Sequence, residues 1–178
     1  LDTCKALAKE QEKTGYPKYI GVSTGKNKQD RILEAAKIVK GAMRLNGSVQ
    51  SLDPEIQKNM NRSNISKEQI VDLALKSSEI GSNSTSEVIL GLPGETRATA
   101  METIDYSQTL DMYSITFPIA VPFVGTTLRK QAERGDYGLK ILTNDWKEYG
   151  KQNGRIMESD ELSYQDLLDL QKTAYDGR

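Results

Sequence analysis

Residues 87–96 carry the clearest chemical signal in this sequence. An apolar run at 88–90 enters a turn that contains Gly91 and Gly94, and a helix is expected to follow. Because glycine has no side chain, these two positions let a flat ligand or another stretch of backbone come close. Glu95 lies where the positive end of the following helix favours a carboxylate. The pattern fits a ligand-binding turn, and it equally fits an ordinary tight connection between a strand and a helix.

Two residue types that carry much of enzyme chemistry are scarce. The chain has no histidine and a single cysteine, Cys4. These counts exclude Ser-His-Asp and Cys-His catalysis, the usual zinc, copper and non-haem iron ligand sets, and an intrachain disulfide within this segment. Gly21 and Gly25 approach a phosphate loop, but three residues rather than four separate them and Asn27 follows Lys26. A turn that ends a strand is the better interpretation.

The charge balance gives no sign of a nucleic-acid or membrane partner. The 178 residues include 24 basic and 25 acidic side chains, for a net charge of -1. A protein that binds nucleic acid or an anionic membrane usually carries an excess of positive charge. No apolar run approaches the roughly 20 residues that cross a bilayer, and the first residues do not resemble a signal peptide. We therefore expect a cytoplasmic protein.

Strands and helices alternate along most of the chain. Strands are predicted at 18–23, 42–50, 86–90 and 112–117, and helices at 1–14, 31–40, 97–110 and 126–134. Two more helices are expected to begin after Asp53, with Pro54 at the first helical position, and after Ser66, with Gln69 completing a capping box. Ile65 and Ile70 form a hydrophobic staple across that box, and Gly81 suits the end of its helix. Strands at these intervals predict βαβ units and an α/β fold with a parallel sheet.

The pattern changes after Gly125. Residues 135–158 are polar and irregular and include Trp146, and a last helix is expected after Ser163, stapled by Leu162 and Leu167. We interpret residues 1–134 as part of a partial β/α barrel and residues 135–178 as an irregular and helical covering segment. Four parallel strands do not close a barrel. We therefore expect a fragment of a larger enzyme whose preceding half-barrel is missing.

Residues 87–95 resemble the G-x-I-x-G-x-x-G-E motif of the radical S-adenosylmethionine (SAM) enzymes. Ile89, Gly91, Gly94 and Glu95 match that motif, and Glu87 replaces its first glycine. In this family the motif lies late in a partial (βα)6 barrel and supports the adenine of the cofactor. The resemblance implies that the chain is the C-terminal portion of such a TIM-like barrel, with a C-terminal helical extension.

Three other segments resemble the family in the expected order. Residues 48–56 with Arg62 resemble the preceding strand–helix unit, and residues 121–128 resemble the last barrel strand, with Val124 in place of a proline. Residues 146–149 and the helix after Ser163 are similar to the tail of the cobalamin-binding branch. The resemblance therefore extends over nearly the whole chain.

The resemblance implies roles for individual residues. Ser48, Gln50 and Ser51 would hold the ribose and the methionine end of SAM, and Arg62 would pair with its carboxylate. Pro122 and Phe123 would flank the adenine. Each role has a structural alternative: a solvated helix charge for Arg62, a hydrogen-bonded turn near Asp53 for Gln50 and Ser51, and core packing for Phe123.

The resemblance also implies cofactors that this chain cannot hold alone. The family binds a [4Fe–4S] cluster through C-x-x-x-C-x-x-C, and the fourth iron binds SAM. Cys4 is the only cysteine, so we expect no metal ligand here and no activity from this chain alone. The full-length protein would generate a 5′-deoxyadenosyl radical and, with cobalamin, transfer a methyl group to a small-molecule substrate.

Two other function classes stay open at this point. The chain would also fit a non-catalytic α/β domain that binds a ligand or acts as a scaffold. A different barrel enzyme that acts on phosphate-bearing substrates is the third alternative. The radical SAM interpretation requires the strand ends near Gln50, Gly91 and Pro122 to lie together, because barrel sites are built at the carboxyl ends of the strands.

Overall fold

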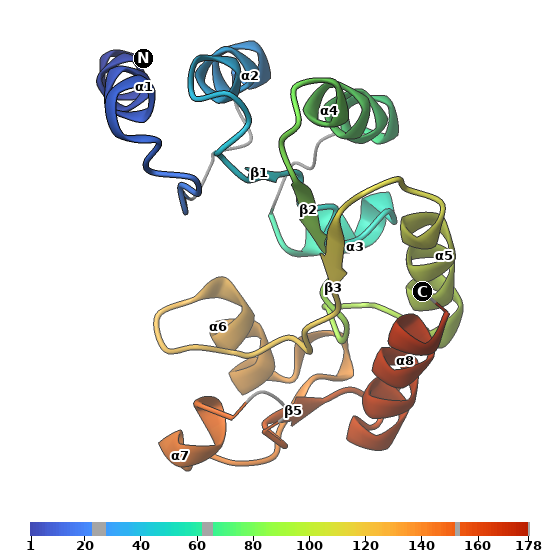
Figure 1. Cartoon of the computed structure of the whole chain (residues 1–178). Helices are drawn as coiled ribbons and strands as arrows, with labels where there is room; N and C mark the ends of the chain where they lie inside the picture. The colour runs from blue at the N-terminus through green and yellow to red at the C-terminus, as the bar shows by residue number, and fades with distance from the viewer. Residues whose placement is uncertain (23–27, 62–65, 152–153, 178) are drawn as a thin grey trace. The chain divides into compact units, whose positions relative to one another are not determined.

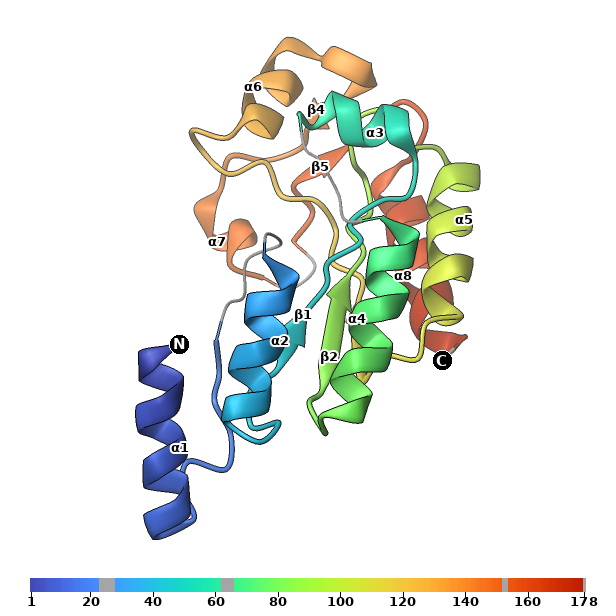
Figure 2. The same ribbon diagram turned by 90° about the horizontal axis from the view of Figure 1, so that it is seen from above.

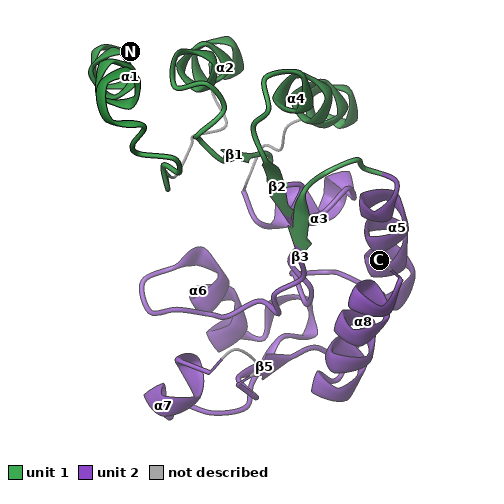
Figure 3. Ribbon diagram, viewed as in Figure 1, with its two compact units in different colours: residues 1–48, 65–86, 110–115 green, residues 49–64, 87–109, 116–178 purple. Residues whose placement is uncertain are grey.

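The structure of the chain is a computed structural model that describes residues 1–22, 28–61, 66–151 and 154–177. The chain forms two compact units, each assembled from separate stretches of sequence (Figure 3). Unit 1 comprises residues 1–48, 65–86 and 110–115, and unit 2 comprises residues 49–64, 87–109 and 116–178. The domain boundary that the sequence suggests after residue 134 stays a prediction.

Unit 1 contains most of a small parallel sheet, whose residues Glu87 and Thr116 belong to unit 2, with helices beside it. The sheet has the order β1-β2-β3, and β1 pairs with β2 in parallel, with Leu45 opposite Ser84. An isolated parallel bridge joins Ile20 to Met43. Figures 1 and 2 show the three helices of this unit side by side along one side of β1 and β2. The elements are α1 (Asp2–Thr14), α2 (Gln29–Ile38), β1 (Leu45–Asn46), α4 (Lys67–Glu79), β2 (Ser84–Glu87) and β3 (Ser114–Thr116).

The core of unit 1 lies between these helices and the sheet. In β1 the side chain of Leu45 is buried while that of Asn46 is exposed, as the alternation of a strand requires. The helices α2 and α4 contribute their apolar faces, and the side chains of α1 pack only partly against them. Cys4 is among these half-buried side chains, so it behaves as a small apolar residue. The buried members of the core are Leu33, Ala35, Ala36, Val39, Met43, Leu45 and Leu73.

Unit 2 holds the remaining helices and a short hairpin. Its elements are α3 (Pro54–Asn59), α5 (Arg97–Gln108), α6 (Thr127–Arg134), the 3-10 turn η1 (Asp136–Gly138), β4 (Lys140–Ile141), α7 (Trp146–Tyr149), β5 (Met157–Glu158) and α8 (Tyr164–Asp176). Helices α5 and α8 lie side by side in both ribbon views (Figures 1 and 2). One buried cluster of this unit comprises Ile56, Leu92, Ala120, Ala132, Leu139 and Met157.

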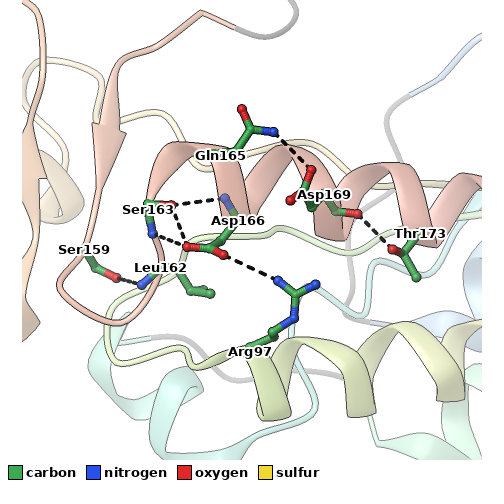
Figure 4. Close-up of polar contacts among 8 residues, drawn as sticks. All are labelled: Arg97, Ser159, Leu162, Ser163, Gln165, Asp166, Asp169 and Thr173. Atoms are coloured by element: carbon green, nitrogen blue, oxygen red, sulfur yellow. Dashed lines mark hydrogen bonds and ion pairs between the residues drawn. The ribbon is translucent and has the colours of Figure 1, made fainter.

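The helix starts follow the local signals of the sequence. Asp53 caps α3, and Ser66 with Gln69 forms the capping box of α4. At the start of α8, the Ser163 hydroxyl accepts a hydrogen bond of 3.2 Å from the Asp166 amide, and the Asp166 carboxylate accepts one of 3.0 Å from the Ser163 amide (Figure 4). Arg97 of α5 lies 3.5 Å from the same carboxylate. This contact connects the start of α8 to α5.

The structure departs from the sequence-based expectations in two places. The strands expected at 18–23 and 42–50 are much shorter than predicted. Among the described residues of these two ranges, strand pairing is limited to the Ile20–Met43 bridge, β1 and the bridge at Gln50. Residues 135–158, expected to be irregular, include the antiparallel hairpin of β4 and β5 and the short helix α7. Strands of two residues carry no readable periodicity. The expected staple at Ile65 lies outside the described residues.

The parallel strands and intervening helices confirm an α/β architecture. No helix within the described residues is long and apolar enough to cross a membrane.

Candidate cofactor-binding site

The ends of three neighbouring strand segments lie next to one another in unit 2. A parallel bridge pairs Gln50 with Val88, and a second one pairs Leu90 with Ile119. The Ile89 amide donates to the Gln50 carbonyl at 3.0 Å, and the Ala120 amide donates to the Leu90 carbonyl at 2.7 Å. Gly91 directly follows Leu90, and Pro122 lies two positions after Ala120. The structure therefore brings together the three places that the sequence analysis required to meet.

The turn after this strand is closed by its own carboxylate. Glu95 accepts hydrogen bonds from the backbone amides of Gly91, at 2.6 Å, and of Leu92, at 3.3 Å. Its side chain is almost fully buried, with 2% of the residue exposed. Glu95 directly precedes Thr96, which caps α5, so it lies beside the positive end of that helix as expected. Its carboxylate, however, binds the amides of the preceding turn.

Burial dominates the ionisation of Glu95. Loss of water raises the pKa of the Glu95 carboxyl from 4.5 to about 7, and the negative charge of Asp53 adds to the rise. The two backbone amides act in the opposite direction, because they stabilise the carboxylate form. Glu95 is therefore an ionisable group whose charge changes near neutral pH.

Both glycines of the turn have backbone angles that favour glycine, and both have close neighbours. Gly91 has φ 81° and Gly94 has φ 83°. A Cβ at Gly91 would lie 3.2 Å from the Leu167 side chain, and one at Gly94 would lie 2.8 Å from Nδ2 of Asn59. That amide nitrogen donates to the Pro93 carbonyl at 3.0 Å. The chain itself therefore uses the space that the glycines leave.

The polar residues at the end of the preceding strand are buried. Ser51 is fully buried, and its hydroxyl oxygen accepts a hydrogen bond of 3.3 Å from the Asp53 amide. This contact supports the alternative in which Ser51 stabilises the turn before α3. Gln50 is 8% exposed and has φ 60°, an unusual value for a residue other than glycine. Ser48, in unit 1, donates to Oδ1 of Asn46 at 2.8 Å. Arg62 lies outside the described residues.

A cavity of about 310 Å³ opens beside the strand ends within unit 2. Ile89 lines it, and so do Val121 and Phe123, the neighbours of the buried Pro122. Most of the wall is apolar, as is usual for sites that bind a flat organic group. The complete lining is Met60, Ile89, Leu92, Ala120, Val121, Phe123, Thr126, Thr127, Leu128 and Gln131.

Only part of this cavity was predictable from the sequence. Ile89 and Phe123 were expected at the site, whereas the contributions of α6 and of Met60 were not. The amphipathic pattern of residues 126–134 was a signal for a helix, and it did not show that Gln131 lines a cavity. Ser48, Gln50, Ser51, Gly91, Gly94 and Glu95 do not line the cavity. They form the turns beside it or, for Ser48, belong to unit 1.

The described residues contain no group of three or more histidine, cysteine, aspartate or glutamate side chains that could hold a metal ion. The site is a mostly apolar cavity at the carboxyl ends of parallel strand segments. Such a site is typical of partial or complete β/α barrels that bind a nucleotide-like cofactor.

Residues 3–107 match the Radical SAM superfamily, and the match covers more than half of the chain. The chain belongs to this superfamily, whose members use SAM and a [4Fe–4S] cluster. The resemblance stated from the motif at 87–95 is therefore confirmed.

Two curated relatives are similar over about half of the chain. The 2-(S-pantetheinyl)-carbapenam-3-carboxylate methyltransferase of Streptantibioticus cattleyicolor is 36% identical over 98 residues, which are 53% of this chain and 14% of that protein. The cobalamin-dependent radical SAM methyltransferase TokK of Streptomyces tokunonensis is 31% identical over 99 residues, which are 54% of this chain and 14% of that protein. The matched part thus spans about a seventh of the length of these relatives.

Solved structures confirm the fold class. Coproporphyrinogen III oxidase of Escherichia coli, a radical SAM enzyme, superposes with a TM-score of 0.60 and 18% identity over 89% of this chain and 32% of that chain. The radical SAM methyltransferase TsrM of Kitasatospora setae, solved with cobalamin and a [4Fe–4S] cluster, gives a TM-score of 0.57 and 16% identity over 93% of this chain and 31% of that chain. The fold is therefore a portion of the radical SAM β/α barrel.

Proposed function

We propose that this chain forms the adenosyl-binding portion of a cobalamin-dependent radical SAM methyltransferase. The observation that carries the proposal is the cavity beside the ends of the adjacent strand segments, with Ile89 of the G-x-I-x-G-x-x-G-E-like motif in its wall. Both curated relatives are methyltransferases, which supports the choice of reaction. TokK is cobalamin-dependent, which supports the choice of cobalamin.

The cavity wall suits an adenine ring. Ile89, Val121 and Phe123 offer apolar contact to a flat heteroaromatic group, and a volume of about 310 Å³ lies at the lower end of the range of small-molecule sites. The Glu95 carboxylate would fix the turn that carries Leu92 into the wall, since it binds the Gly91 and Leu92 amides. In this proposal the residues of the turn support the site, and the apolar side chains contact the ligand.

Four other residues would act on the rest of the cofactor. Gln50 offers both donors and acceptors, and Arg62 offers a guanidinium that pairs with a carboxylate. We assign them to the ribose and methionine portions of SAM together with Ser48 and Ser51. When bound, SAM and the cluster supply a reactive adenosyl group, and cobalamin supplies a methyl carrier.

Other parts of the protein would supply the cluster ligands. A [4Fe–4S] site in this family needs three thiolates, and this chain has Cys4 alone, half-buried against the core of unit 1. We therefore propose that this chain alone is inactive and requires a preceding half-barrel. A small-molecule substrate, a cytoplasmic location and the absence of a nucleic-acid partner complete the proposal.

A binding measurement on the full-length protein tests the adenosyl site. Ile89→Ala removes apolar contact from the cavity wall and should weaken the binding of S-adenosylhomocysteine about tenfold, as measured by calorimetry. Val71→Ala, on the exposed side of α4 in unit 1, is the matched control and should bind like the wild type. Equal affinity of the wild type and the Ile89 variant would rule out this cavity as the adenosyl site.

An activity measurement separates the enzyme from a non-catalytic binding domain. The full-length protein, with its cluster reconstituted under anaerobic conditions, should release 5′-deoxyadenosine from SAM when a reductant is added. Methyl transfer should further require cobalamin. A protein that binds S-adenosylhomocysteine and holds a cluster, but releases no 5′-deoxyadenosine under any of these conditions, would contradict the proposed reaction.

A further inference from the structure

The face of the unit 1 sheet that lies opposite its helices is polar and carries Arg44. Met43 and Leu45 are buried in the core against the helices, so strand alternation directs the intervening Arg44 to the other face. Asn46 lies on that face too, as does Thr85, its partner in the register of β2. In a β/α barrel the helices form the outer ring, and the opposite face of the sheet lines the interior. Arg44 is therefore a cation that faces the barrel interior.

Two exposed tyrosines flank the Arg44 guanidinium within unit 1. Its carbon Cζ lies 5.6 Å from the ring centroid of Tyr19 and 5.6 Å from that of Tyr113. Tyr19 precedes Ile20, which packs on the helix side, so Tyr19 also belongs to the interior-facing side of the sheet. The two tyrosines are 58% and 64% exposed. The attraction between the cation and the two rings holds the guanidinium over the sheet.

Arg44 is half-buried but has no hydrogen-bond acceptor in the described part of the chain. Its Nε is buried and unpaired there. The terminal nitrogens Nη1 and Nη2 make no hydrogen bond or ion pair with the described residues and, unlike Nε, remain open to solvent. Arg129, whose side chain is 12% exposed, has by contrast three partners: Tyr149, Asn144 and Glu133. The outer N–H donors of Arg44 are therefore available to a ligand.

These donors and rings fit a carboxylate on a partly apolar molecule. A guanidinium binds a carboxylate through two parallel hydrogen bonds, which is the strongest pairing open to it. Phosphate recognition usually relies on clusters of arginines, whereas Arg44 alone contacts these two rings among the described basic residues. The exposed rings of Tyr19 and Tyr113 offer flat apolar surface to the rest of the ligand.

We infer that Arg44, Tyr19 and Tyr113 form a substrate-binding site in the barrel interior, where Arg44 binds a carboxylate of the methyl-accepting molecule. This inference rests on the proposed function, because it assumes that a small-molecule substrate enters the interior. It adds the class of that substrate, an organic acid with an apolar body. None of the three residues lines the cavity that is proposed for the adenosyl group.

Protection of Arg44 from chemical modification tests the site in the wild-type, full-length protein. Phenylglyoxal modifies accessible guanidinium groups, and mass spectrometry gives the rate at each arginine. Benzoate is the probe, and benzamide, which has a similar shape but no charge, is its matched control. At about ten times its dissociation constant, benzoate should slow the modification of Arg44 about tenfold. Benzamide at the same concentration should slow it less than about twofold, because it lacks the charge. Arg31, exposed on α2, should react equally with and without either probe.

Substitutions at Arg44 separate the charge from the shape of the side chain. Arg44→Met keeps an apolar stem and loses every donor, so the affinity for benzoate, measured by ligand-detected NMR, should fall about tenfold or more. Arg44→Lys keeps the charge but cannot form the paired hydrogen bonds, so its affinity should fall about threefold or more. Arg31→Met is the matched control and should bind benzoate like the wild type. The protection experiment uses no variant, so it tests the inference even where Arg44→Met does not fold.

Binding of S-adenosylhomocysteine, measured on the same sample, distinguishes this inference from the proposed function. The inference fails and the proposed function stands if S-adenosylhomocysteine binds but benzoate does not protect Arg44, or protects Arg31 equally. Stronger protection by phenyl phosphate than by benzoate would overturn the carboxylate class. Protection of Arg44 in a protein that binds no S-adenosylhomocysteine would overturn the assignment to a methyl-accepting substrate. Selective protection of Arg44 by benzoate in a protein that binds S-adenosylhomocysteine supports the inference.

Discussion

The Glu95 carboxylate accepts a hydrogen bond of 2.6 Å from the backbone amide of Gly91, four residues earlier in the chain. This contact closes the turn between the strand end and α5, and it places a nearly buried ionisable group at the centre of the family motif. Burial raises the pKa of the Glu95 carboxyl to about 7 against the opposing effect of this contact, so the stability of the protein depends on pH near neutrality.

The first prediction concerns the pH dependence of stability. Between the ordinary carboxyl pKa of 4.5 and about 7, the folded protein binds the Glu95 proton more tightly than the unfolded chain does. The free energy of unfolding should therefore fall as the pH rises through this range, by at most about 3 kcal/mol. Glu95→Gln stays neutral and keeps an acceptor oxygen. Urea unfolding should show this variant gaining stability over the wild type between pH 5 and pH 8.

The control for this prediction is Glu79→Gln, which removes an exposed carboxylate from the end of α4. If the difference between Glu95→Gln and the wild type is the same at pH 5 and pH 8, burial does not govern the ionisation of Glu95. The neutral variant would then report only the change in hydrogen bonding.

The second prediction concerns the contact between Gly91 and Leu167. Gly91→Ala should destabilise the protein by about 1–2 kcal/mol, because φ 81° is unfavourable for alanine. Crowding adds to this cost, since the new Cβ would lie 3.2 Å from the buried Leu167 side chain. A double-mutant cycle with Leu167→Ala should show a coupling of about 0.5 kcal/mol or more. Strictly additive effects would mean that backbone strain alone limits this position.

The local signals of the sequence were sufficient to locate most helices and the strand ends. Asp53, Ser66 and Ser163 cap their helices as expected, because a cap depends only on residues a few positions away. The meeting of the strand ends near Gln50 and Gly91 was also predictable, since parallel strands end at one edge.

The rest depends on contacts that the local sequence does not encode. Gln131 donates to the Asn59 carbonyl 72 positions away, so its place in the cavity wall could not be derived from neighbouring residues. The direction of the Glu95 side chain was missed for a different reason. A turn carboxylate can bind the amides before it or those after it, and Thr96 takes the position that caps α5. The hairpin of β4 and β5 was missed because its strands have two residues each.

The third prediction uses a matched pair of glycines to measure crowding. Gly94 and Gly125 have nearly equal φ values of 83° and 84°, but only Gly94 has a close neighbour. Gly125→Ala should cost about 1 kcal/mol from backbone strain alone. Gly94→Ala should cost about 1–2 kcal/mol more, because its Cβ displaces Nδ2 of Asn59 from the Pro93 carbonyl. If thermal unfolding shows equal losses of stability for the two variants, the Asn59 side chain moves away from the new Cβ without destabilising the protein.

The fourth prediction concerns Arg129, which connects α6 to the segment after it. Its guanidinium donates to the Tyr149 hydroxyl at 2.7 Å and to Oδ1 of Asn144 at 2.8 Å, and it pairs with Glu133 at 2.7 Å. The side chain is only 12% exposed. A lysine ammonium cannot reproduce this planar set of donors, so Arg129→Lys should destabilise the protein by about 1–3 kcal/mol.

Arg134→Lys is the matched control for this substitution. Arg134 lies on the same helix and pairs with Asp136, but its side chain is 60% exposed, so the change should cost no more than about 1 kcal/mol. Hydrogen exchange should show faster amide exchange at residues 140–149 in the Arg129 variant and unchanged exchange in the control. Because α6 carries Leu128 and Gln131 in the cavity wall, the Arg129 variant should also bind S-adenosylhomocysteine more weakly. Faster exchange with unaltered affinity would show that the cavity keeps its form without the Arg129 contacts.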